Sequence, residues 1–471
     1  MREPHTPLDT PLFDPLLYSL NQRLSDALLD SSNTPAVDAL LNGAVAEYVQ
    51  RVVPAALRRE FGLYLTPSAM AADLVRPYRE RLVNGCRVQD PTCGAGDLLL
   101  AAADHLPLNT SISSTLTDWS QLIGGSDISP ALRSAARTRL TMLAARRHGG
   151  LIPVTSCAPE HLCAIQVTDV LDDPRRADSD LVLLNPPYTQ IIAPVRARRW
   201  AKGRVSAAAV VFADSVDAAA PGTTIAAILP ESLRSGVRYE KWRTYVSALA
   251  KIESIETVGQ FDTEVDIDVF ILRMRKAADL STGLPSWLPH SKWSGGRVAD
   301  FFEVRVGTVV PHRDREGPTL TPYLTGRACA GKVLTSETLP ERGFGPRTFS
   351  PPFVALHRTS SPSDKQRLIT FMVVGSRPVS VENHLLVLRP MDGARRTCER
   401  LIAEFQQASA AVEINNIIRC RHLTASAVAS LPLRGTHFGG CSDDHPSAAN
   451  EGRAIQQLDV GGPNGTKYLA L

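Results

Sequence analysis

The chain has 471 residues, of which 44% are hydrophobic and 21% charged, and its formal net charge at pH 7 is +3. This length suits two or three domains, each with its own core, and the composition is that of an ordinary globular protein. The net charge is too small to indicate a polyanionic partner by itself.

No apolar run reaches membrane-spanning length, and the N-terminus has no basic-then-apolar signal segment. We therefore expect a cytoplasmic protein with no membrane partner. The eight cysteines include no CxxC pair, although Cys157, His161 and Cys163 lie close together. Because this group lacks a second ligand pair at zinc-site spacing, we predict no metal site. We expect no disulfides in a chain of this type, which fits a reduced cytosol.

The first 60 residues predict a helical segment, in which Leu16, Leu20 and Leu24 recur every four residues. We expect it to cap or brace the rest of the chain, and its residues suggest no chemistry. Residues 64–68 (YLTPS) follow, ahead of a helix predicted over about residues 69–81.

A glycine-rich turn, residues 91–96 (PTCGAG), joins a short predicted strand to a helix over about residues 97–103. Gly94 and Gly96 permit a ligand to approach the backbone closely, and the N–H groups at the helix start face it. Such turns usually bind nucleotides, although GxG alone is a weak signal. The chain has no GxxxxGK[ST] sequence, so a small zwitterionic nucleoside fits better than a triphosphate.

Two acidic residues follow later predicted strands. Asp127 ends the segment 122–127, ahead of a helix predicted over residues 130–147, and an acid at this place typically binds two ribose hydroxyls. Asp169 follows the segment 164–168 and could accept a hydrogen bond from an adenine amine. A helix cap is the alternative role for Asp169.

The sequence NPPY follows an apolar strand predicted over residues 181–184. Its prolines lack an N–H and fix φ, so a rigid extended segment is expected at the carboxyl end of the strand, where α/β sheets bind ligands. The Asn185 amide oxygen and the Pro186 carbonyl could accept both hydrogens of a nucleobase amine, while Tyr188 stacks on the base. An isolated NPPY would more often be only a strand-ending turn.

Helices and strands alternate up to about residue 275. The predicted elements are a helix over residues 207–219, a strand over 223–229, a helix over 239–250, and strands over 252–260 and 267–274. This alternation predicts an α/β fold with a mostly parallel, doubly wound sheet that ends in a hairpin.

A basic loop that contains Trp200 lies between NPPY and the next helix. A charge run is usually a solvated loop, but a basic, tryptophan-bearing loop beside a candidate reaction site favours contact with nucleic-acid phosphates. Its cations are Arg196, Arg198, Arg199, Lys202 and Arg204.

The composition changes near residue 285, where Ser, Gly, Pro and Trp interrupt the pattern. We divide the chain into a helical segment (1–60), a catalytic domain (61–282), a C-terminal domain (283–435) and a disordered tail (436–471). The C-terminal domain should combine strands at about residues 302–310, 353–357, 371–374 and 384–388 with a helix near 394–408.

The motifs YLTP, DPTCGAGDLLLAA, GSDIS, TDVL and NPPY, in this order, resemble those of the gamma-class adenine-specific (N6) DNA methyltransferases of restriction–modification systems. The resemblance covers about residues 60–435, most strongly up to 275. It implies a Rossmann-like class I S-adenosylmethionine-dependent methyltransferase sheet, with an α+β target-recognition domain at the C-terminus. It also implies site-specific methyl transfer from S-adenosylmethionine to the N6 amine of an adenine flipped out of double-stranded DNA. A separate restriction endonuclease is the partner expected in such a system.

Carried over residue by residue, the resemblance implies the following roles. Thr66 and Pro67 would line the methionine end of the cofactor, and Asp90, Cys93, Gly94 and Gly96 would shape the turn beneath its amino acid moiety. Asp127 would bind the ribose and Asp169 the adenine amine, with Ile128 and Val170 beside them. Asn185, Pro186, Pro187 and Tyr188 would hold the target base, and Phe261 would stack on its other face.

Two other classes of function stay open. NPPY also occurs in methyltransferases that modify RNA bases or protein glutamine. The protein-glutamine enzymes usually end soon after the catalytic domain, whereas this chain continues for about 150 residues, one more domain's worth. A non-catalytic DNA-binding specificity subunit would keep only the fold, and the intact DPTCGAG and NPPY sequences argue against it.

Overall fold

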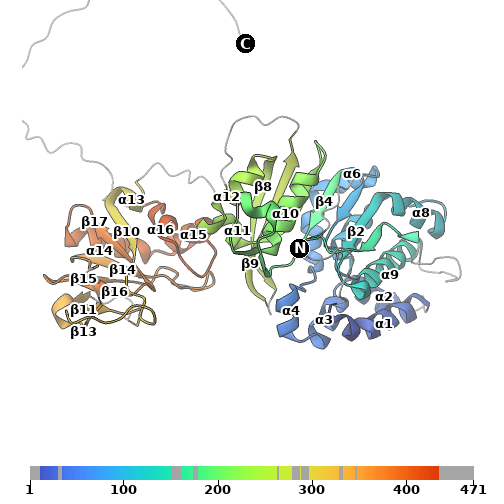
Figure 1. The fold of residues 1–471 in the computed structure, drawn as a ribbon. Coiled ribbons are helices and arrows are strands. Elements are labelled where there is room, and N and C mark those ends of the chain that lie inside the picture. The colour runs from blue at the N-terminus through green and yellow to red at the C-terminus, as the bar shows by residue number, and fades with distance from the viewer. Residues whose placement is uncertain are drawn as a thin grey trace, which may run out of the picture.

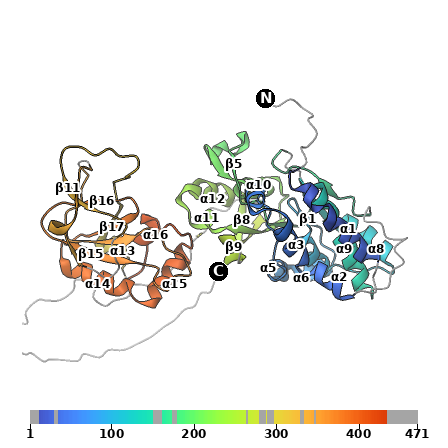
Figure 2. The ribbon, with the colours of Figure 1, turned by 90° about the horizontal axis from the view of Figure 1, so that it is seen from below.

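The structure is a computed structural model that describes residues 11–29, 34–149, 161–172, 179–262, 265–277, 287, 296–327, 333–344 and 347–433. The predicted disordered tail, residues 436–471, lies outside the described residues, as does Cys157. The chain forms two lobes, which meet near helices α11 (Glu231–Ser235) and α15 (Ala408–Ile417) (Figures 1 and 2).

The N-terminal segment is helical, as predicted. It contains η1 (Asp14–Leu17), α1 (Tyr18–Leu29), α2 (Thr34–Leu41), α3 (Ala44–Val52) and α4 (Ala55–Phe61). Leu20 and Leu24 of α1 are buried in a core shared with Leu132 of helix α9 (Pro130–Arg147). Asp14 is also buried, and it accepts hydrogen bonds from the Ser129 hydroxyl and the Ala131 N–H at the start of α9. The segment is therefore tied to the rest of the lobe by apolar packing and by this cap.

The described residues of the larger lobe form a seven-stranded sheet with the order β3-β2-β1-β4-β7-β9-β8. Strands β3, β2, β1, β4 and β7 are mutually parallel, and β9 is antiparallel to both β7 and β8. The prediction of a mostly parallel sheet that ends in a hairpin is thus confirmed. The strands are β1 (Val88–Asp90), β2 (Ile123–Asp127), β3 (Ile165–Val167), β4 (Leu181–Leu184), β7 (Thr224–Pro230), β8 (Ala250–Asp262) and β9 (Val265–Lys276).

Helices cover both faces of this sheet. Residues of β4 alternate between the two cores: Leu181 and Leu183 belong to one, Val182 and Leu184 to the other. A strand buried on both faces reads as a continuous apolar run, which explains the sequence LVLL. The first core also contains α5 (Ser68–Val75), α6 (Arg79–Val83), α7 (Asp97–Ala103), α8 (Ile112–Leu122) and α9, and the second contains α10 (Ala207–Ala218), α11 and α12 (Glu240–Ser247).

The strand order reverses at β1 and β4, which are neighbours in the sheet. In open α/β sheets, the crevice outside the carboxyl ends of the strands at such a switch point is where ligands bind. The glycine turn follows β1 and NPPY follows β4. The topology therefore brings these two motifs together.

The C-terminal lobe has a sheet and a core of its own. Its five-stranded sheet has the order β10-β17-β14-β15-β12, and helix α14 (Arg395–Phe405) packs on it with α15 and α16 (Ala425–Ala429). The predicted helix near 394–408 corresponds to α14. The strands are β10 (Phe302–Val306), β12 (Val333–Thr335), β14 (Phe353–His357), β15 (Thr370–Val374) and β17 (Leu385–Pro390), with β11 (Thr321–Leu324), β13 (Glu341–Arg342) and β16 (Ser380–Val381) in a smaller sheet. None of the helices that the structure describes has the length and apolarity needed to cross a membrane.

Candidate functional site

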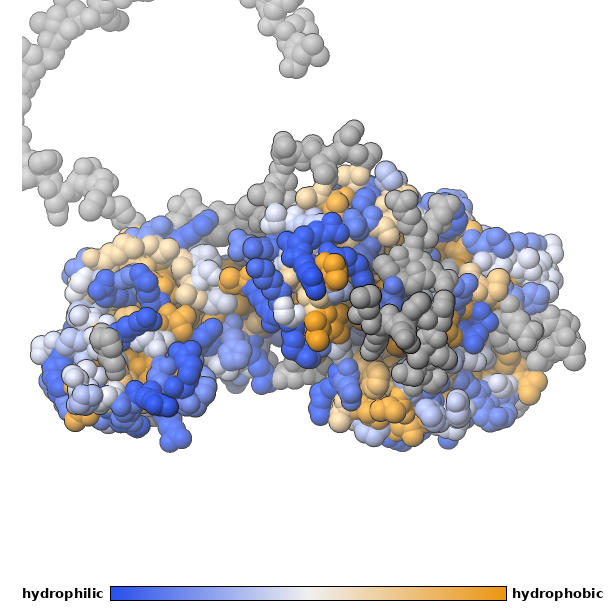
Figure 3. Space-filling model, viewed as in Figure 1, coloured by the Kyte–Doolittle hydropathy of each residue, from blue (hydrophilic) through white to orange (hydrophobic). Residues whose placement is uncertain are grey.

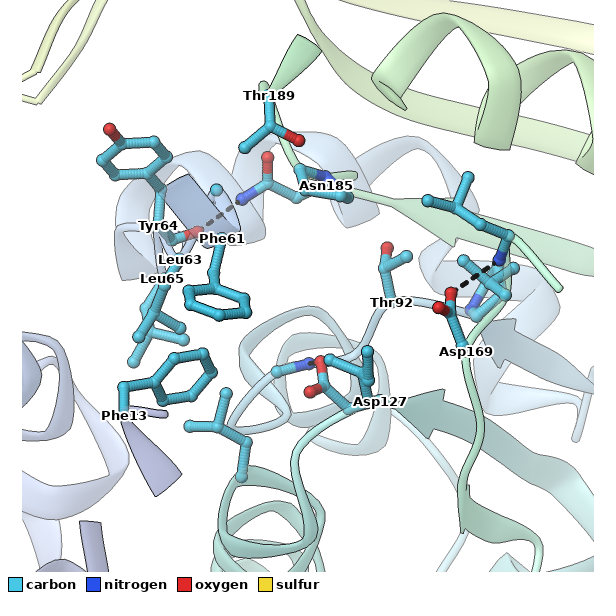
Figure 4. A pocket seen from close by; sticks show the side chains of 18 of the residues that line it. Phe13, Phe61, Leu63, Tyr64, Leu65, Thr92, Asp127, Asp169, Asn185 and Thr189 are labelled. Atoms are coloured by element: carbon cyan, nitrogen blue, oxygen red, sulfur yellow. Dashed lines mark hydrogen bonds between the residues drawn. The ribbon is translucent and has the colours of Figure 1, made fainter. Parts of the chain in front are cut away.

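A cavity of about 230 Å³ lies at the carboxyl ends of β1, β2 and β4 (Figure 4). Its walls combine the two motifs of the switch point with residues from the N-terminal helical segment. The residues are Phe13, residues 60–65, Pro91, Thr92, Gly94, Asp127, Ile128, Leu132, residues 168–171, Asn185, Pro187 and Thr189.

The glycine turn forms one wall of the cavity, and its two glycines have different neighbours. Gly94 lines the cavity with φ +54°, and a Cβ on it would lie 3.1 Å from Leu65 Cδ2. Gly96 has φ +87°, and a Cβ on it would lie 3.1 Å from Ala136 Cβ of α9. The absence of a Cβ on Gly94 thus leaves space at the cavity wall, next to Leu65. The absence of a Cβ on Gly96 lets α9 pack closely against the turn.

Asp127, at the end of β2, supplies a carboxylate to the cavity. Its Oδ2 accepts the Gly94 N–H at 3.0 Å and its Oδ1 accepts the Ser129 N–H at 2.9 Å. Burial raises the pKa of Asp127 to about 6, although both hydrogen bonds act to lower it. Each carboxylate oxygen keeps a free lone pair, so the group could still accept two hydroxyls.

Asp169 lies across the cavity from Phe13 and Phe61 (Figure 4). Its Oδ1 accepts the Leu171 N–H at 2.9 Å, which makes a local turn. No helix begins there in the described residues, so this turn takes the place of the helix cap considered above.

The amide of Asn185 is held in one orientation. Its Nδ2 donates to the Tyr64 carbonyl at 3.1 Å and to the Thr66 hydroxyl oxygen at 2.9 Å. A carbonyl is only an acceptor, so the nitrogen must lie on this side. The amide oxygen is therefore fixed on the other side, where it accepts the Tyr188 hydroxyl at 2.8 Å.

Three aromatic rings meet beside this amide. The ring centroid of Tyr188 lies 6.3 Å from that of Tyr64 and 5.9 Å from that of Phe261. Phe261 is only 3% exposed, and burial raises the pKa of Tyr188 well above its usual value. The Tyr188 hydroxyl also donates to the Ile228 carbonyl of β7 at 3.3 Å. The rings contact one another, so a base would have to part them in order to stack between them.

The predicted site residues fall into two groups. Gly94, Asp127, Ile128, Asp169, Val170, Asn185 and Pro187 line the cavity. Thr66, Pro67, Asp90, Cys93, Gly96, Pro186, Tyr188 and Phe261 do not line it. Within the second group, Thr66 faces Asn185, and Asp90 is buried beneath the turn, where it accepts the Thr92 N–H at 3.0 Å. Burial raises the pKa of Asp90 to about 8.

Sequence reasoning missed the aromatic wall made by Phe13 and Phe61, whose ring centroids lie 5.2 Å apart. We expected no chemistry from the first 60 residues, yet this segment closes one side of the cavity. No local motif marks either residue, because their position depends on how the segment packs on α9. Tyr64 of the YLTP motif also lines the cavity, and it is the aromatic residue of this wall that a sequence motif marks.

The basic loop is partly engaged with its own domain. It lies between strands β5 (Gln190–Ile192) and β6 (Arg204–Ser206). Arg196 forms an ion pair with Asp214 at 2.8 Å, and Arg199 pairs with Asp217 at 3.4 Å. Trp200 is buried in the core.

The remaining cations of the loop, Arg198, Lys202 and Arg204, are exposed. The guanidinium of Arg204 donates to the Gln190 carbonyl at 2.7 Å. Within the described structure, the side chains of Arg198 and Lys202 have no hydrogen-bond or ion-pair partner. These two are therefore the cations of the loop that are available to an external anion.

No family model and no curated protein matches the sequence. Among solved structures, the chain is similar to the type IIL restriction-modification enzyme MmeI in complex with DNA, with 12% identity over 83% of this chain and 70% of that one, and a TM-score of 0.52. It also matches the type IIG restriction endonuclease BpuSI (13% identity, 92% and 69% of the two chains, TM-score 0.44) and a class I S-adenosylmethionine-dependent methyltransferase from Listeria monocytogenes (13%, 58% and 91%, TM-score 0.33).

At this level of identity, the likeness to MmeI concerns the fold. The strand order, the parallel strands and the helices on both faces of the sheet define the fold of the larger lobe. The larger lobe thus has an α/β Rossmann-like fold with a mostly parallel sheet.

Proposed function

We propose that the protein is a site-specific DNA methyltransferase that transfers a methyl group from S-adenosylmethionine to the N6 amine of a flipped-out adenine. The observation that carries the proposal is the fixed orientation of the Asn185 amide, whose oxygen lies beside an aromatic cluster and next to the candidate cofactor cavity. The motif resemblance supports adenine as the target. A role in a restriction–modification system of the cytoplasm, with a separate endonuclease, belongs to the same proposal.

The cavity suits the cofactor chemically. Asp127 offers a carboxylate to two hydroxyls, and Asp169 brings a second carboxylate to the cavity wall, where an amine could bind. Ile128, Val170 and the aromatic wall supply apolar surface for a flat base. When bound, S-adenosylmethionine would supply an electrophilic methyl group.

The chain's own residues would activate the amine. A nucleobase amine is a poor nucleophile because its lone pair is delocalised into the ring. The Asn185 Oδ1 has two lone pairs, of which Tyr188 uses one, so the other could accept one amine hydrogen while the Pro186 carbonyl accepts the second. Both acceptors would draw the nitrogen toward tetrahedral geometry. The proton could then leave after methyl transfer, so no strong general base is required.

The C-terminal lobe would recognise the DNA sequence. On the face seen in Figure 3, its surface is largely hydrophilic. Several arginines between residues 313 and 347 are exposed, and guanidinium groups bind phosphates and guanine edges. The exposed residues are Arg313, Arg315, Arg327, Arg342 and Arg347.

The test is single-turnover methyl transfer to duplex DNA, with the modified nucleoside identified by mass spectrometry and its sequence context by long-read sequencing. Wild-type protein should yield N6-methyladenine at a defined site. Asn185→Ala should lower the rate by about a hundred-fold or more, about 3 kcal/mol, because the lost acceptor acts mainly in the transition state. Methylation of RNA or protein instead, or near-normal turnover of Asn185→Ala on DNA, would contradict the proposal.

A further inference from the structure

A short segment of the C-terminal lobe, residues 416–421, lies against the larger lobe at α11. Glu231 and Arg234 of α11 form an ion pair that is 2% and 1% exposed. The Arg234 Nη1 also donates to the Asn416 carbonyl at 3.0 Å, and the Arg419 N–H donates to Glu231 Oε1 at 3.4 Å. The buried pair of one lobe therefore binds the backbone of the other.

The Arg419 side chain reaches the β8–β9 hairpin. Its Nε lies 3.4 Å from Asp268 Oδ1 on β9. Gly259 of β8 has φ +106°, and a Cβ on it would lie 3.3 Å from an Arg419 guanidinium nitrogen. A glycine here thus allows the guanidinium to approach the strand backbone closely.

Phe261 lies next to this contact. Gln260 pairs with Asp268 across the hairpin, and the register then shifts before Asp262 pairs with Val265. Such irregularities bend a strand and re-aim its side chains. The direction of Phe261 therefore depends on a hairpin end that Arg419 holds.

The segment is held in shape by its own lobe. Arg367 is fully buried and donates to the Ile418 carbonyl at 3.1 Å and to the Cys420 carbonyl at 2.7 Å. Burial lowers the pKa of Arg367 to about 10, so it still carries its charge at neutral pH. The backbone on both sides of Arg419 is thus fixed by hydrogen bonds from Arg367.

We propose that Arg419 is a positioning residue that couples the placement of the C-terminal lobe to the direction of Phe261, the candidate base-stacking ring. This inference rests on the proposed function. Under this proposal, the lobe that recognises the DNA sequence also positions Phe261 on one side of the base pocket. A purely structural joint would stabilise the protein without affecting the pocket.

The variants are Arg419→Ala, Arg419→Lys and Asp268→Asn in the full chain. The matched control is Arg389→Ala, which removes an exposed ion pair with Glu303 in the same lobe. Three quantities are measured: the single-turnover methylation rate, the affinity for S-adenosylmethionine, and the fluorescence of 2-aminopurine at the target adenine. Hydrogen exchange of the Gly259, Gln260 and Phe261 amides is followed without DNA.

Arg419→Ala and Asp268→Asn should lower the methylation rate at least tenfold and alter the 2-aminopurine signal, with cofactor affinity unchanged. Arg419→Lys should recover part of the rate, and the Arg389→Ala control should match the wild type. Amide exchange at the hairpin end should become faster in Arg419→Ala and Asp268→Asn, and stay unchanged in the Arg389→Ala control. A normal rate or unchanged exchange in Arg419→Ala would overturn the inference. If the wild type itself does not methylate DNA, the proposed function fails, and the exchange result alone decides whether Arg419 fixes the hairpin.

Discussion

The orientation of the Asn185 amide is set by two residues of the YLTP motif. The amide has two possible orientations, and the Tyr64 carbonyl and Thr66 hydroxyl select the one that leaves the oxygen free of the backbone. The resemblance implies that Thr66 lines the methionine end of the cofactor. In the structure, Thr66 also accepts a hydrogen bond from the Asn185 Nδ2. A change at Thr66 should therefore alter turnover, and not only the affinity for the cofactor.

Thr66→Val removes one acceptor for the Asn185 Nδ2 and keeps the side-chain volume. We expect turnover to fall about tenfold, since one such hydrogen bond is worth about 1.4 kcal/mol, while the affinity for S-adenosylmethionine stays the same. Thr66→Ser should restore turnover, and Ser68→Ala, which alters an exposed neighbouring hydroxyl, is the control. Steady-state kinetics separate the two roles: a change confined to the KM for the cofactor would mean that Thr66 acts on the cofactor and not on Asn185.

Asp127 predicts a pH dependence of cofactor binding. Burial raises its pKa to about 6, so the carboxyl is mostly protonated at pH 5 and mostly ionised at pH 7. If only the ionised form accepts the ribose hydroxyls, affinity should rise about tenfold between these two pH values. Isothermal titration of wild type and Asp127→Asn checks this, and a wild-type affinity as flat as that of the variant would exclude Asp127 from the cofactor site.

At the scale of elements, the glycine turn separates ligand binding from packing. Both glycines have positive φ, where an L-residue costs about 1–2 kcal/mol, but their surroundings differ. A Cβ on Gly94 would meet the flexible end of Leu65, whereas a Cβ on Gly96 would also lie 3.2 Å from the Ala136 Cα in the backbone of α9. Only the first can be accommodated by a side-chain movement.

Gly94→Ala should therefore mainly weaken S-adenosylmethionine binding, because Gly94 lines the cavity and its N–H holds Asp127. Gly96→Ala should mainly lower the free energy of unfolding, because α9 must shift. Calorimetric melting and cofactor titration of both variants give the two quantities. The reverse ranking would show that the roles assigned to the two glycines are wrong.

Sequence was informative at this scale wherever a local rule decides the outcome. The sequence predicts the strand–turn–helix pattern and the places of Asp127 and NPPY, because each lies at the end of a strand that the topology brings to one edge of the sheet. It does not predict packing between segments that lie far apart in the chain. Phe13 reaches the cavity only because η1 and α1 pack on α9, and the pairing of Arg196 with Asp214 depends on how the loop folds against α10. Helix α15, which follows α14, likewise had no clear marker in the sequence and was not predicted.

At the scale of the whole molecule, the proposed function requires both lobes to act on one DNA, and a net charge of +3 gives little general attraction. Affinity for phosphates must then come from local groups. Asp214 and Asp217 neutralise part of the positive charge of the basic loop through their ion pairs with Arg196 and Arg199. Arg198 and Lys202 are exposed. The loop is thus expected to contact DNA through fewer cations than its sequence contains.

The double variant Arg198→Ala/Lys202→Ala should weaken DNA binding and reduce the slope of log K against log[salt] by up to about 2, since each phosphate contact contributes about 0.9. Arg196→Ala is the contrasting variant. Its guanidinium already binds Asp214 and the Leu171 carbonyl, so we expect lower stability with little change of slope. Fluorescence anisotropy with a duplex over a range of salt concentrations measures the slopes, and thermal melting measures stability. If Arg196→Ala reduced the slope as much as the double variant, the ion pair with Asp214 would have to open on DNA, and the whole loop would be the contact surface.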